Sequence, residues 1–311
     1  MKLGIIELKP VIKSVAKNVF KSVLTSEYLR KQLFTKPYVK NIGDGVYRIS
    51  ELFLINSYLF VGSERALLVD TGIGIKGMKE AVKNITDKPL TVVVTHSHLT
   101  SIGGAGEFDE VYIDKEDLKY AVKNSEGLYK KVFLRLIPNK TLISLSRENF
   151  VEKTGNFVPL DKSTDEFNLG GKTVKLINTP SHTRGSVCFS DPDSKIVVTG
   201  HVTLPIMFMT FFNSTNMEKY KESFEKLIDP LTDGTNCSGI GPLPLSFEKT
   251  KDLKQLVDDA VDVGNDYTQV VRLRSSPDRK RALIYLPART IRRKRKERFK
   301  ALFKKPDEVV F

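Results

Sequence analysis

Residues 91–104, TVVVTHSHLTSIGG, decide the fold of this chain. An apolar run of β-type residues leads into a His-x-His pair and then into a turn of small residues. In an extended segment residues i and i+2 point the same way, so His96 and His98 can present both imidazoles to one ion. The only other histidines are His182, in INTPSHTRGS, and His201, in IVVTGH. Each also follows an apolar run or lies in a turn, which predicts a common metal site.

On both sides of this stretch, short β-type runs alternate with turns and helical segments. Before it come GVYRIS (45–50), LFLINSYLFVG (52–62), ALLVDTG (66–72) and a helical stretch over 77–85. After it come GGKTVKLINTP (170–180), SVCFSDPDS (186–194), KIVVTG (195–200) and a helix over 217–228. Strands grouped with helices between and after them predict a layered α/β domain.

The length of 311 residues suits one large domain, or one and a half, with a substantial core, and the net charge of +13 is concentrated at the chain ends. We predict three parts: residues 1–37 as an N-terminal amphipathic helical extension, 38–248 as the main domain, and 249–311 as a basic, mostly helical C-terminal extension. The basic run ARTIRRKRKERFKALFKKP (288–306) is interpreted as a solvated helix face. An anionic membrane surface is the alternative partner, and nucleic acid is not favoured because no recognition motif accompanies the run.

The N-terminal stretch VIKSVAKNVFKSVLTSEYLRKQLF (11–34) carries an apolar helical face and a lysine face. We interpret it as a helix packed on the domain, with an interfacial membrane helix as the alternative. No run approaches the roughly 20 apolar residues that cross a bilayer, and lysines interrupt the N-terminal apolar pattern, so we expect a cytoplasmic protein. Cys188 and Cys237 are too few and too far apart for a disulfide framework, and we expect two ordinary reduced thiols.

Several collinear motifs resemble the metallo-β-lactamase superfamily over residues 40–248. They are SYLFVGSERALLVDTGIG, TVVVTHSHLTSIGG, FNLGGKTVKLINTPSHTRGS, KIVVTGHVTLP and SGIGPLP. The resemblance implies an α/β fold, a four-layered αββα sandwich with the metal-binding loops along one edge of two sheets. It also implies hydrolysis of a small-molecule substrate.

The resemblance assigns ligands to two metals. For the first metal, the two histidines of HxHxDH and the histidine of the TPGHT-like motif carry over to His96, His98 and His182. The second metal would take the aspartate and histidine of DH, the carboxylate of TGD and a final histidine. Those four positions hold Thr100, Ser101, His201 and Ile240. Hydroxyls bind zinc weakly and isoleucine has no donor, so we predict at most one zinc ion.

Two further residues have predicted roles in the chemistry. Asp70, in ALLVDTG, matches the family's buried carboxylate that supports the histidine loop, although a turn or cap aspartate is an alternative. His201 has three interpretations: a fourth metal ligand that closes the site, a proton acceptor, or a side chain that fills the space of the second metal. Three histidines and an open position form a known catalytic zinc arrangement, in which bound water has a pKa of about 7.

The sequence therefore predicts a hydrolase-like protein with a single-metal site and reduced or altered hydrolysis of an ester, thioester, lactone or amide. The alternative is a metal-free pseudoenzyme, or a binding or scaffold protein with a redesigned site. A metal-free serine nucleophile, with Ser101, His201 and Asp114 near one pocket, is a further alternative. Residues 116–165 are the candidate lid over the substrate, and they can equally form a packed helix pair.

Overall fold

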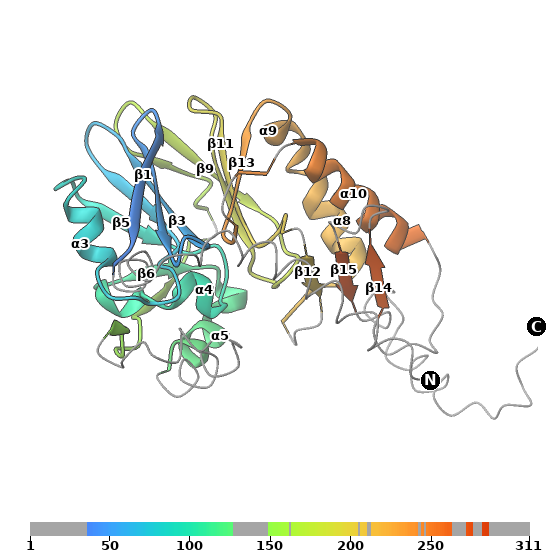
Figure 1. Cartoon of the computed structure of the whole chain (residues 1–311), viewed down its shortest axis with the longest axis horizontal. Helices are drawn as coiled ribbons and strands as arrows, with labels where there is room; N and C mark the ends of the chain where they lie inside the picture. Colours follow the sequence, from blue (N-terminus) through green and yellow to red (C-terminus); the bar gives the residue numbers. More distant parts are fainter. Residues whose placement is uncertain are drawn as a thin grey trace, which may run out of the picture.

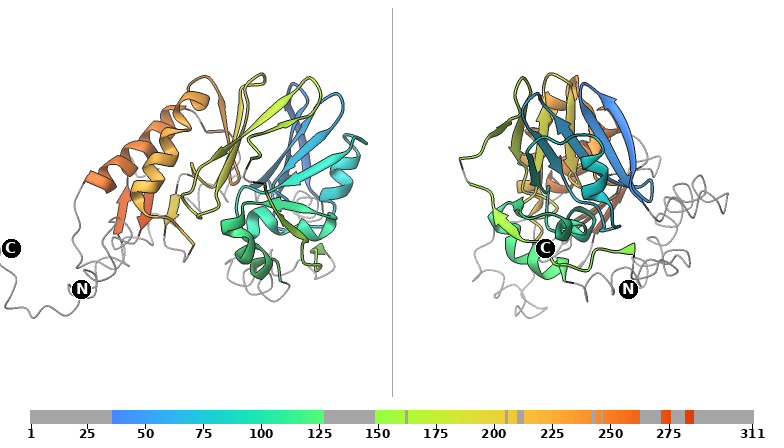
Figure 2. Two further views of the ribbon diagram at one scale, coloured as in Figure 1. Left: turned by 180° about the vertical axis from the view of Figure 1, so that it is seen from behind. Right: turned by 90° about the vertical axis from the view of Figure 1, so that its left-hand side faces the viewer.

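The computed structural model describes residues 36–126, 149–161, 163–204, 206–209, 213–241, 244–245, 247–262, 272–275 and 282–285. The described chain forms two facing sheets, each covered by helices on its outer side (Figure 1). This is the four-layered αββα sandwich that the sequence predicts. The two views of Figure 2 show the same layers from behind and from one end.

The first sheet has the strand order β1-β2-β3-β4-β5-β6-β7. The strands from β1 to β4 are antiparallel to their neighbours, and β4 to β7 run parallel. The strand bounds are β1 Tyr38–Gly43, β2 Val46–Glu51, β3 Ile55–Val61, β4 Ala66–Val69, β5 Leu90–Val93, β6 Val111–Ile113 and β7 Phe157–Pro159. The parallel strands end at the same edge, where the His-x-His segment begins.

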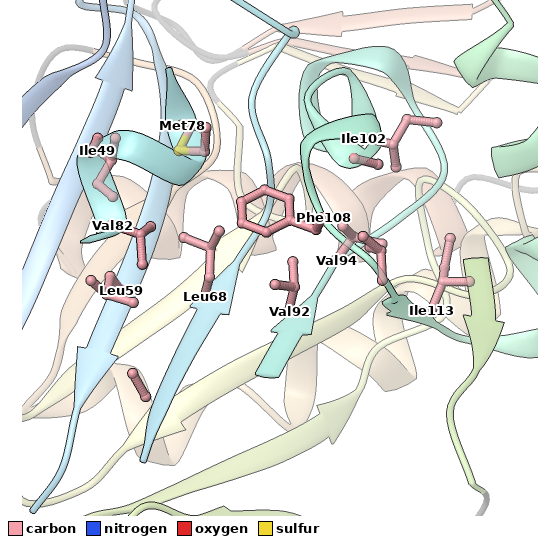
Figure 3. Close-up of a cluster of buried hydrophobic side chains, with 14 of the residues drawn as sticks. Ile49, Leu59, Leu68, Met78, Val82, Val92, Val94, Ile102, Phe108 and Ile113 are labelled. Atoms are coloured by element: carbon pink, nitrogen blue, oxygen red, sulfur yellow. The ribbon is translucent and has the colours of Figure 1, made fainter. Parts of the chain in front are cut away.

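Helices cover the outer face of this sheet. They are α3 Met78–Lys83, α4 Leu99–Ile102, the 3-10 helix Ala105–Glu107 and α5 Lys115–Ser125. Successive strand residues point to opposite faces, so Leu68 and Val92 pack outward with Met78 and Phe108 (Figure 3). Their neighbours Leu67 and Val93 are buried between the sheets instead. Burial on both faces explains the uninterrupted apolar runs of β4 and β5.

The second sheet has the order β13-β11-β10-β9-β8. Its bounds are β8 Glu166–Asn168, β9 Thr173–Asn178, β10 Val187–Asp191, β11 Ile196–Gly200 and β13 Thr235–Ser238. Strands β8 to β11 are antiparallel, and β11 pairs with β13 in parallel. Val187, Phe189 and Val198 pack against the first sheet and form the inner core.

The outer helices of the second sheet are α8 Met217–Glu225, α9 Ile228–Thr232 and α10 Phe247–Asp262. Tyr220 and Phe224 of α8 share a buried cluster with Leu253 and Val257 of α10. The segment from 249 onward therefore begins inside a helix that completes this core.

The described residues also form a third, small sheet in the order β12-β15-β14. Its bounds are β12 Ile206–Met209, β14 Arg272–Ser275 and β15 Ala282–Tyr285.

Several of the predictions concern residues that the structure does not describe. The amphipathic stretch 11–34 and the basic run 288–306 lie outside the described residues, as do residues 127–148 of the candidate lid. The domain boundaries at 37 and 248 stay predictions. Among the helices of the described segments, none has the length and apolar character needed to span a bilayer.

Candidate metal centre

The four histidines meet at the edge where the two sheets approach each other. His96 and His98 follow β5, His182 lies in the loop between β9 and β10, and His201 follows β11. One nitrogen from each ring lies within 4.8 Å of the others. The structure thus brings together the four metal-ligand candidates named from the sequence.

The separations of the donor nitrogens can be compared with those around one tetrahedral ion. A tetrahedral zinc with Zn–N bonds of 2.0–2.1 Å holds its ligand nitrogens about 3.3 Å apart. His201 Nδ1 lies 3.4 Å from His182 Nε2, and His98 Nδ1 lies 2.8 Å from the same atom. His96 Nε2 is buried and has no hydrogen-bond partner among the described residues. A buried orphan nitrogen between three other imidazoles fits a metal ligand, because burying it unpaired is costly.

Hydroxyl groups and Asp70 fix the orientation of the His96 ring. His96 Nδ1 lies 3.0 Å from Thr95 Oγ1 and 3.2 Å from Ser101 Oγ. Asp70 Oδ2 accepts the Thr95 hydroxyl at 2.9 Å, and Oδ1 accepts the Thr95 backbone N–H at 2.7 Å. This chain of bonds places Nδ1 against the hydroxyls and directs Nε2 to the other histidines. Asp70 is fully buried, has a φ of 66°, and burial raises its pKa to about 7.

His201 lies between His182 and Thr100. Its Nε2 lies 3.2 Å from Thr100 Oγ1, and its Nδ1 faces His182. The glycine before it, Gly200, has a φ of +52°, and a Cβ there would lie 2.6 Å from Thr95 Oγ1. Only glycine allows β11 to end this close to the His-x-His segment. The replacement at 201 therefore places an imidazole inside the histidine cluster.

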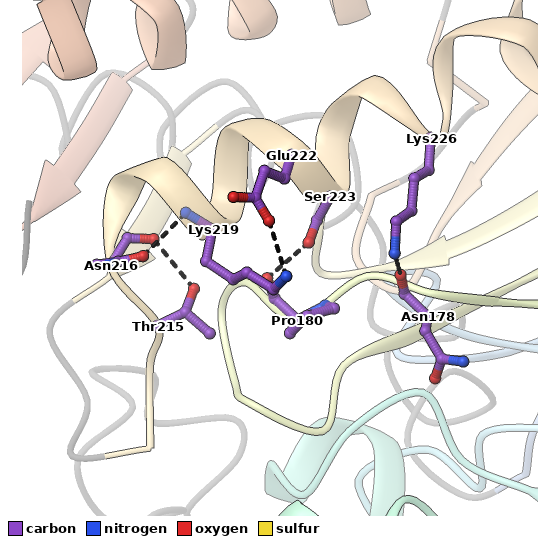
Figure 4. A network of polar contacts seen from close by, with 8 residues as sticks. All are labelled: Asn178, Pro180, Thr215, Asn216, Lys219, Glu222, Ser223 and Lys226. Atoms are coloured by element: carbon purple, nitrogen blue, oxygen red, sulfur yellow. Dashed lines mark hydrogen bonds and ion pairs between the residues drawn. The ribbon is translucent and has the colours of Figure 1, made fainter. Parts of the chain in front are cut away.

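Helix α8 and the residues before it hold the His182 loop. Ser223 donates to the Pro180 carbonyl and Lys226 donates to the Asn178 carbonyl, both at 2.8 Å (Figure 4). Ser214 Oγ donates to the carbonyl of His182 itself, also at 2.8 Å. Asn178 is the exposed last residue of β9, and Pro180 and His182 lie in the loop that follows, so α8 and the residues flanking it help to hold His182 in position.

The electrostatics of the cluster favour the neutral form of three of the four imidazoles. Burial is the main reason that the pKa values of His96, His98 and His201 are well below the usual range, and the neighbouring imidazoles lower them further. Neutral imidazole is the form that binds metal. The ligand set consists of nitrogen donors only, which suits zinc and other borderline transition metals better than Mg²⁺ or Ca²⁺.

Two buried carboxylates near the site were missed by the sequence reasoning. Asp117 of α5 accepts the backbone N–H of Ser97, between His96 and His98. Glu51, at the end of β2, accepts the backbone N–H groups of Ile73 and Ile75 in the loop after Asp70. An acid in the first turn of a helix is an ordinary sequence feature, so nothing distinguished Asp117.

Two members of the proposed serine site have other hydrogen-bond partners. Ser101 is buried, and its Oγ lies 3.2 Å from His96 Nδ1. Asp114 Oδ1 accepts the N–H of Glu116 and caps α5. The metal-free serine alternative gains no support from this arrangement. Cys188 and Cys237 are both buried and free, as expected.

Comparisons with known proteins agree with the fold and the loops described above. The Metallo-beta-lactamase superfamily model matches residues 51–233. The acyl-coenzyme A thioesterase MBLAC2 of Homo sapiens is 26% identical over 215 residues, which cover 63% of this chain and 76% of that protein.

Two solved structures share the fold. A metallo-beta-lactamase from Pontibacter korlensis has a TM-score of 0.54 and 16% identity, covering 72% of this chain and 100% of that one. The sec-alkylsulfatase Pisa1 from Pseudomonas sp. has a TM-score of 0.56 and 12% identity, covering 79% and 46%. With the family model matching more than half of its length, the chain belongs to the metallo-β-lactamase superfamily.

Proposed function

We propose that this protein binds one zinc-like ion through His96, His98 and His182 and hydrolyses a small-molecule thioester. The observation that carries the proposal is the convergence of the histidine nitrogens within 4.8 Å, with His96 Nε2 buried and unpaired among the described residues. The thioester class is supported by the similarity to proteins named acyl-coenzyme A thioesterases, which covers 76% of the human relative.

The proposal includes one ion and not two. Thr100 and Ser101 of α4 offer hydroxyls, and Ile240 offers no donor at the position that the resemblance assigns to a last histidine. Ile240 pairs with Ile55 across a β-bridge. The neighbouring Gly239 lies against the His201 ring, since a Cβ there would be 3.3 Å from His201 Cδ2. We expect altered or reduced hydrolysis compared with a two-ion site.

The residues have distinct roles in this proposal. When bound, the ion supplies a Lewis acid for the thioester carbonyl and lowers the pKa of water. Asp70 and Thr95 orient the His96 ring. His201 stands beside the ligand nitrogens and acts as the proton acceptor during hydrolysis, with Thr100 holding its second nitrogen.

A noncatalytic metal site is the second candidate, and one observation favours it. His201 Nδ1 lies at a ligand-to-ligand separation of 3.4 Å from His182 Nε2. If His201 is a fourth ligand, the coordination is closed and suits holding the ion more than chemistry. The two candidates predict opposite effects of H201A: hydrolysis falls if His201 accepts a proton and rises if His201 blocks the open position.

The test combines metal analysis with a substrate panel. Protein purified without a histidine tag is analysed for zinc and assayed on acetyl-, octanoyl- and hexadecanoyl-coenzyme A and on matched oxygen esters. We expect about one zinc and hydrolysis of a thioester that H98A abolishes. One zinc without hydrolysis of any ester supports the closed site. Absence of zinc would overturn both candidates and leave a metal-free pseudoenzyme.

A further inference from the structure

Helix α5 contacts both loops that carry the metal-ligand histidines, and one side chain makes the link. Asp117 is fully buried on the first turn of α5. Its Oδ2 accepts the Ser97 backbone N–H at 2.9 Å, and its Oδ1 accepts the Gly185 backbone N–H at 3.3 Å. Ser97 lies within the His-x-His segment, and Gly185 lies three residues after His182. These two loops are far apart in the sequence.

Ser97 is held on three sides. Besides the Asp117 bond to its N–H, Asn124 Nδ2 donates to its carbonyl at 2.8 Å. Asn213 Nδ2 donates to its hydroxyl at 3.2 Å. Because Ser97 separates His96 from His98, its backbone orientation sets the direction in which both rings project.

The second loop approaches the carboxylate closely because of Gly185. A Cβ at this position would lie 2.8 Å from Asp117 Cβ and 3.0 Å from Asp117 Cγ. A side chain at 185 would therefore push the loop away from α5. Asn213 reinforces the contact, since its carbonyl accepts the Arg184 N–H at 2.8 Å and its Nδ2 lies 3.4 Å from Asp117 Oδ1.

Acceptor capacity explains why this position needs a carboxylate. The two oxygens of Asp117 face the backbone donors of Ser97 and Gly185. A carboxylate accepts on both oxygens, whereas an asparagine has one acceptor oxygen and would turn an NH₂ group toward one of the donors. One of the two loops would then lose its bond to α5.

We propose that Asp117 is a positioning residue that ties the His-x-His segment to the His182 loop and so sets the separation of His98 and His182. The inference rests on the proposed metal site for its effect on zinc, but the bridge itself can be tested without metal. The proposal assigns α5 a role in metal affinity, although no α5 side chain belongs to the proposed ligand set.

Three single variants of the full chain test the proposal. D117N removes one acceptor, and G185A pushes the His182 loop away from an intact carboxylate. A121G is the matched control: Ala121 is buried on the same helix, so the glycine destabilises α5 without removing a bond to either loop. Amide hydrogen exchange at Ser97 and Gly185 is measured without metal, and zinc affinity is measured by competition with a chromophoric chelator.

In D117N we expect exchange at least about tenfold faster at Ser97 or Gly185 and zinc binding weakened about 10- to 100-fold, the usual effect of removing support for metal ligands. G185A shows the same loss of affinity, and the Co²⁺ absorption spectrum changes in both variants. A121G lowers the melting temperature but retains the wild-type Co²⁺ spectrum and zinc affinity.

Unchanged exchange in D117N, or equal zinc losses in D117N and A121G, would overturn the positioning role. If the wild type binds no zinc, the proposed function fails, and the exchange measurement still decides whether Asp117 bridges the two loops.

Discussion

His98 Nδ1 and His182 Nε2 face each other at 2.8 Å, although the two residues are 84 positions apart in the chain. One comes from the end of a parallel strand in the first sheet and the other from a loop of the second sheet. Two neutral imidazole nitrogens at this distance are either hydrogen-bonded to each other or bound to the same ion. In both cases the contact connects the two halves of the sandwich. The metal hypothesis depends on this relationship.

H98A is expected to abolish zinc retention, because it removes one of three proposed ligands and its 2.8 Å contact with His182. T100A is the matched control, since Thr100 contacts His201 and is not a proposed ligand. Zinc content after dialysis measures both. Equal loss of zinc in H98A and T100A would show that the ligand assignment is wrong.

Restoring the family ligands is expected to create a second metal site. The quadruple variant T100D/S101H/H201D/I240H places two carboxylates and two imidazoles at the positions that the resemblance assigns. We expect a second equivalent of zinc and faster hydrolysis of generic esters or lactones. A folded quadruple variant that binds no additional zinc would contradict the assignment of these positions.

D70N is expected to weaken zinc binding about 10- to 100-fold by disturbing the bonds that orient His96. Asparagine tolerates the positive φ of 66° at this position, so the backbone is retained. The measurement is chelator competition, with thermal unfolding to separate affinity from stability. Unchanged affinity in D70N would leave Asp70 as a structural turn residue.

The raised pKa of the buried Glu51 carboxyl predicts that the free energy of unfolding depends on pH. Burial raises its pKa from 4.5 to about 8, opposed by backbone N–H bonds from Ile73, Gly74 and Ile75. A carboxyl whose pKa is raised in the folded state stabilises the protein fully below pH 4.5, and this stabilisation is lost as the pH rises toward 8. In E51Q the group does not titrate.

The free energy of unfolding in urea is compared for wild type and E51Q at pH 5, 6.5 and 8. We expect the advantage of the wild type to shrink as the pH rises, by at most about 1.4 kcal/mol per pH unit. An advantage that stays constant from pH 5 to pH 8 would mean that Glu51 is already ionised in the folded protein over this range.

Local pattern was sufficient for seven of the twelve strands described in the two main sheets and for naming the four histidines. The runs of β-branched and apolar residues predicted β4, β5 and β11 because strands buried on both faces carry no polar alternation. The helix predicted over 77–85 corresponds to α3, and that over 217–228 contains α8. The spacing of His96 and His98 predicted that the two rings would meet, and their centroids lie 5.0 Å apart, although residues 95–98 form bends and not an extended strand.

The contacts between segments that are far apart in the chain could be seen only in the tertiary structure. The sequence left His201 as ligand, proton acceptor or filler, and the fold places its Nδ1 beside His182 and its Nε2 beside Thr100. Ser101 faces His96, which depends on how α4 packs under the histidine loop. In the sequence, Asp117 looks like any acidic residue at the start of a helix. Its burial between two histidine loops follows from the docking of α5, and a hydrogen bond between segments nearly 70 residues apart leaves no local pattern in the chain.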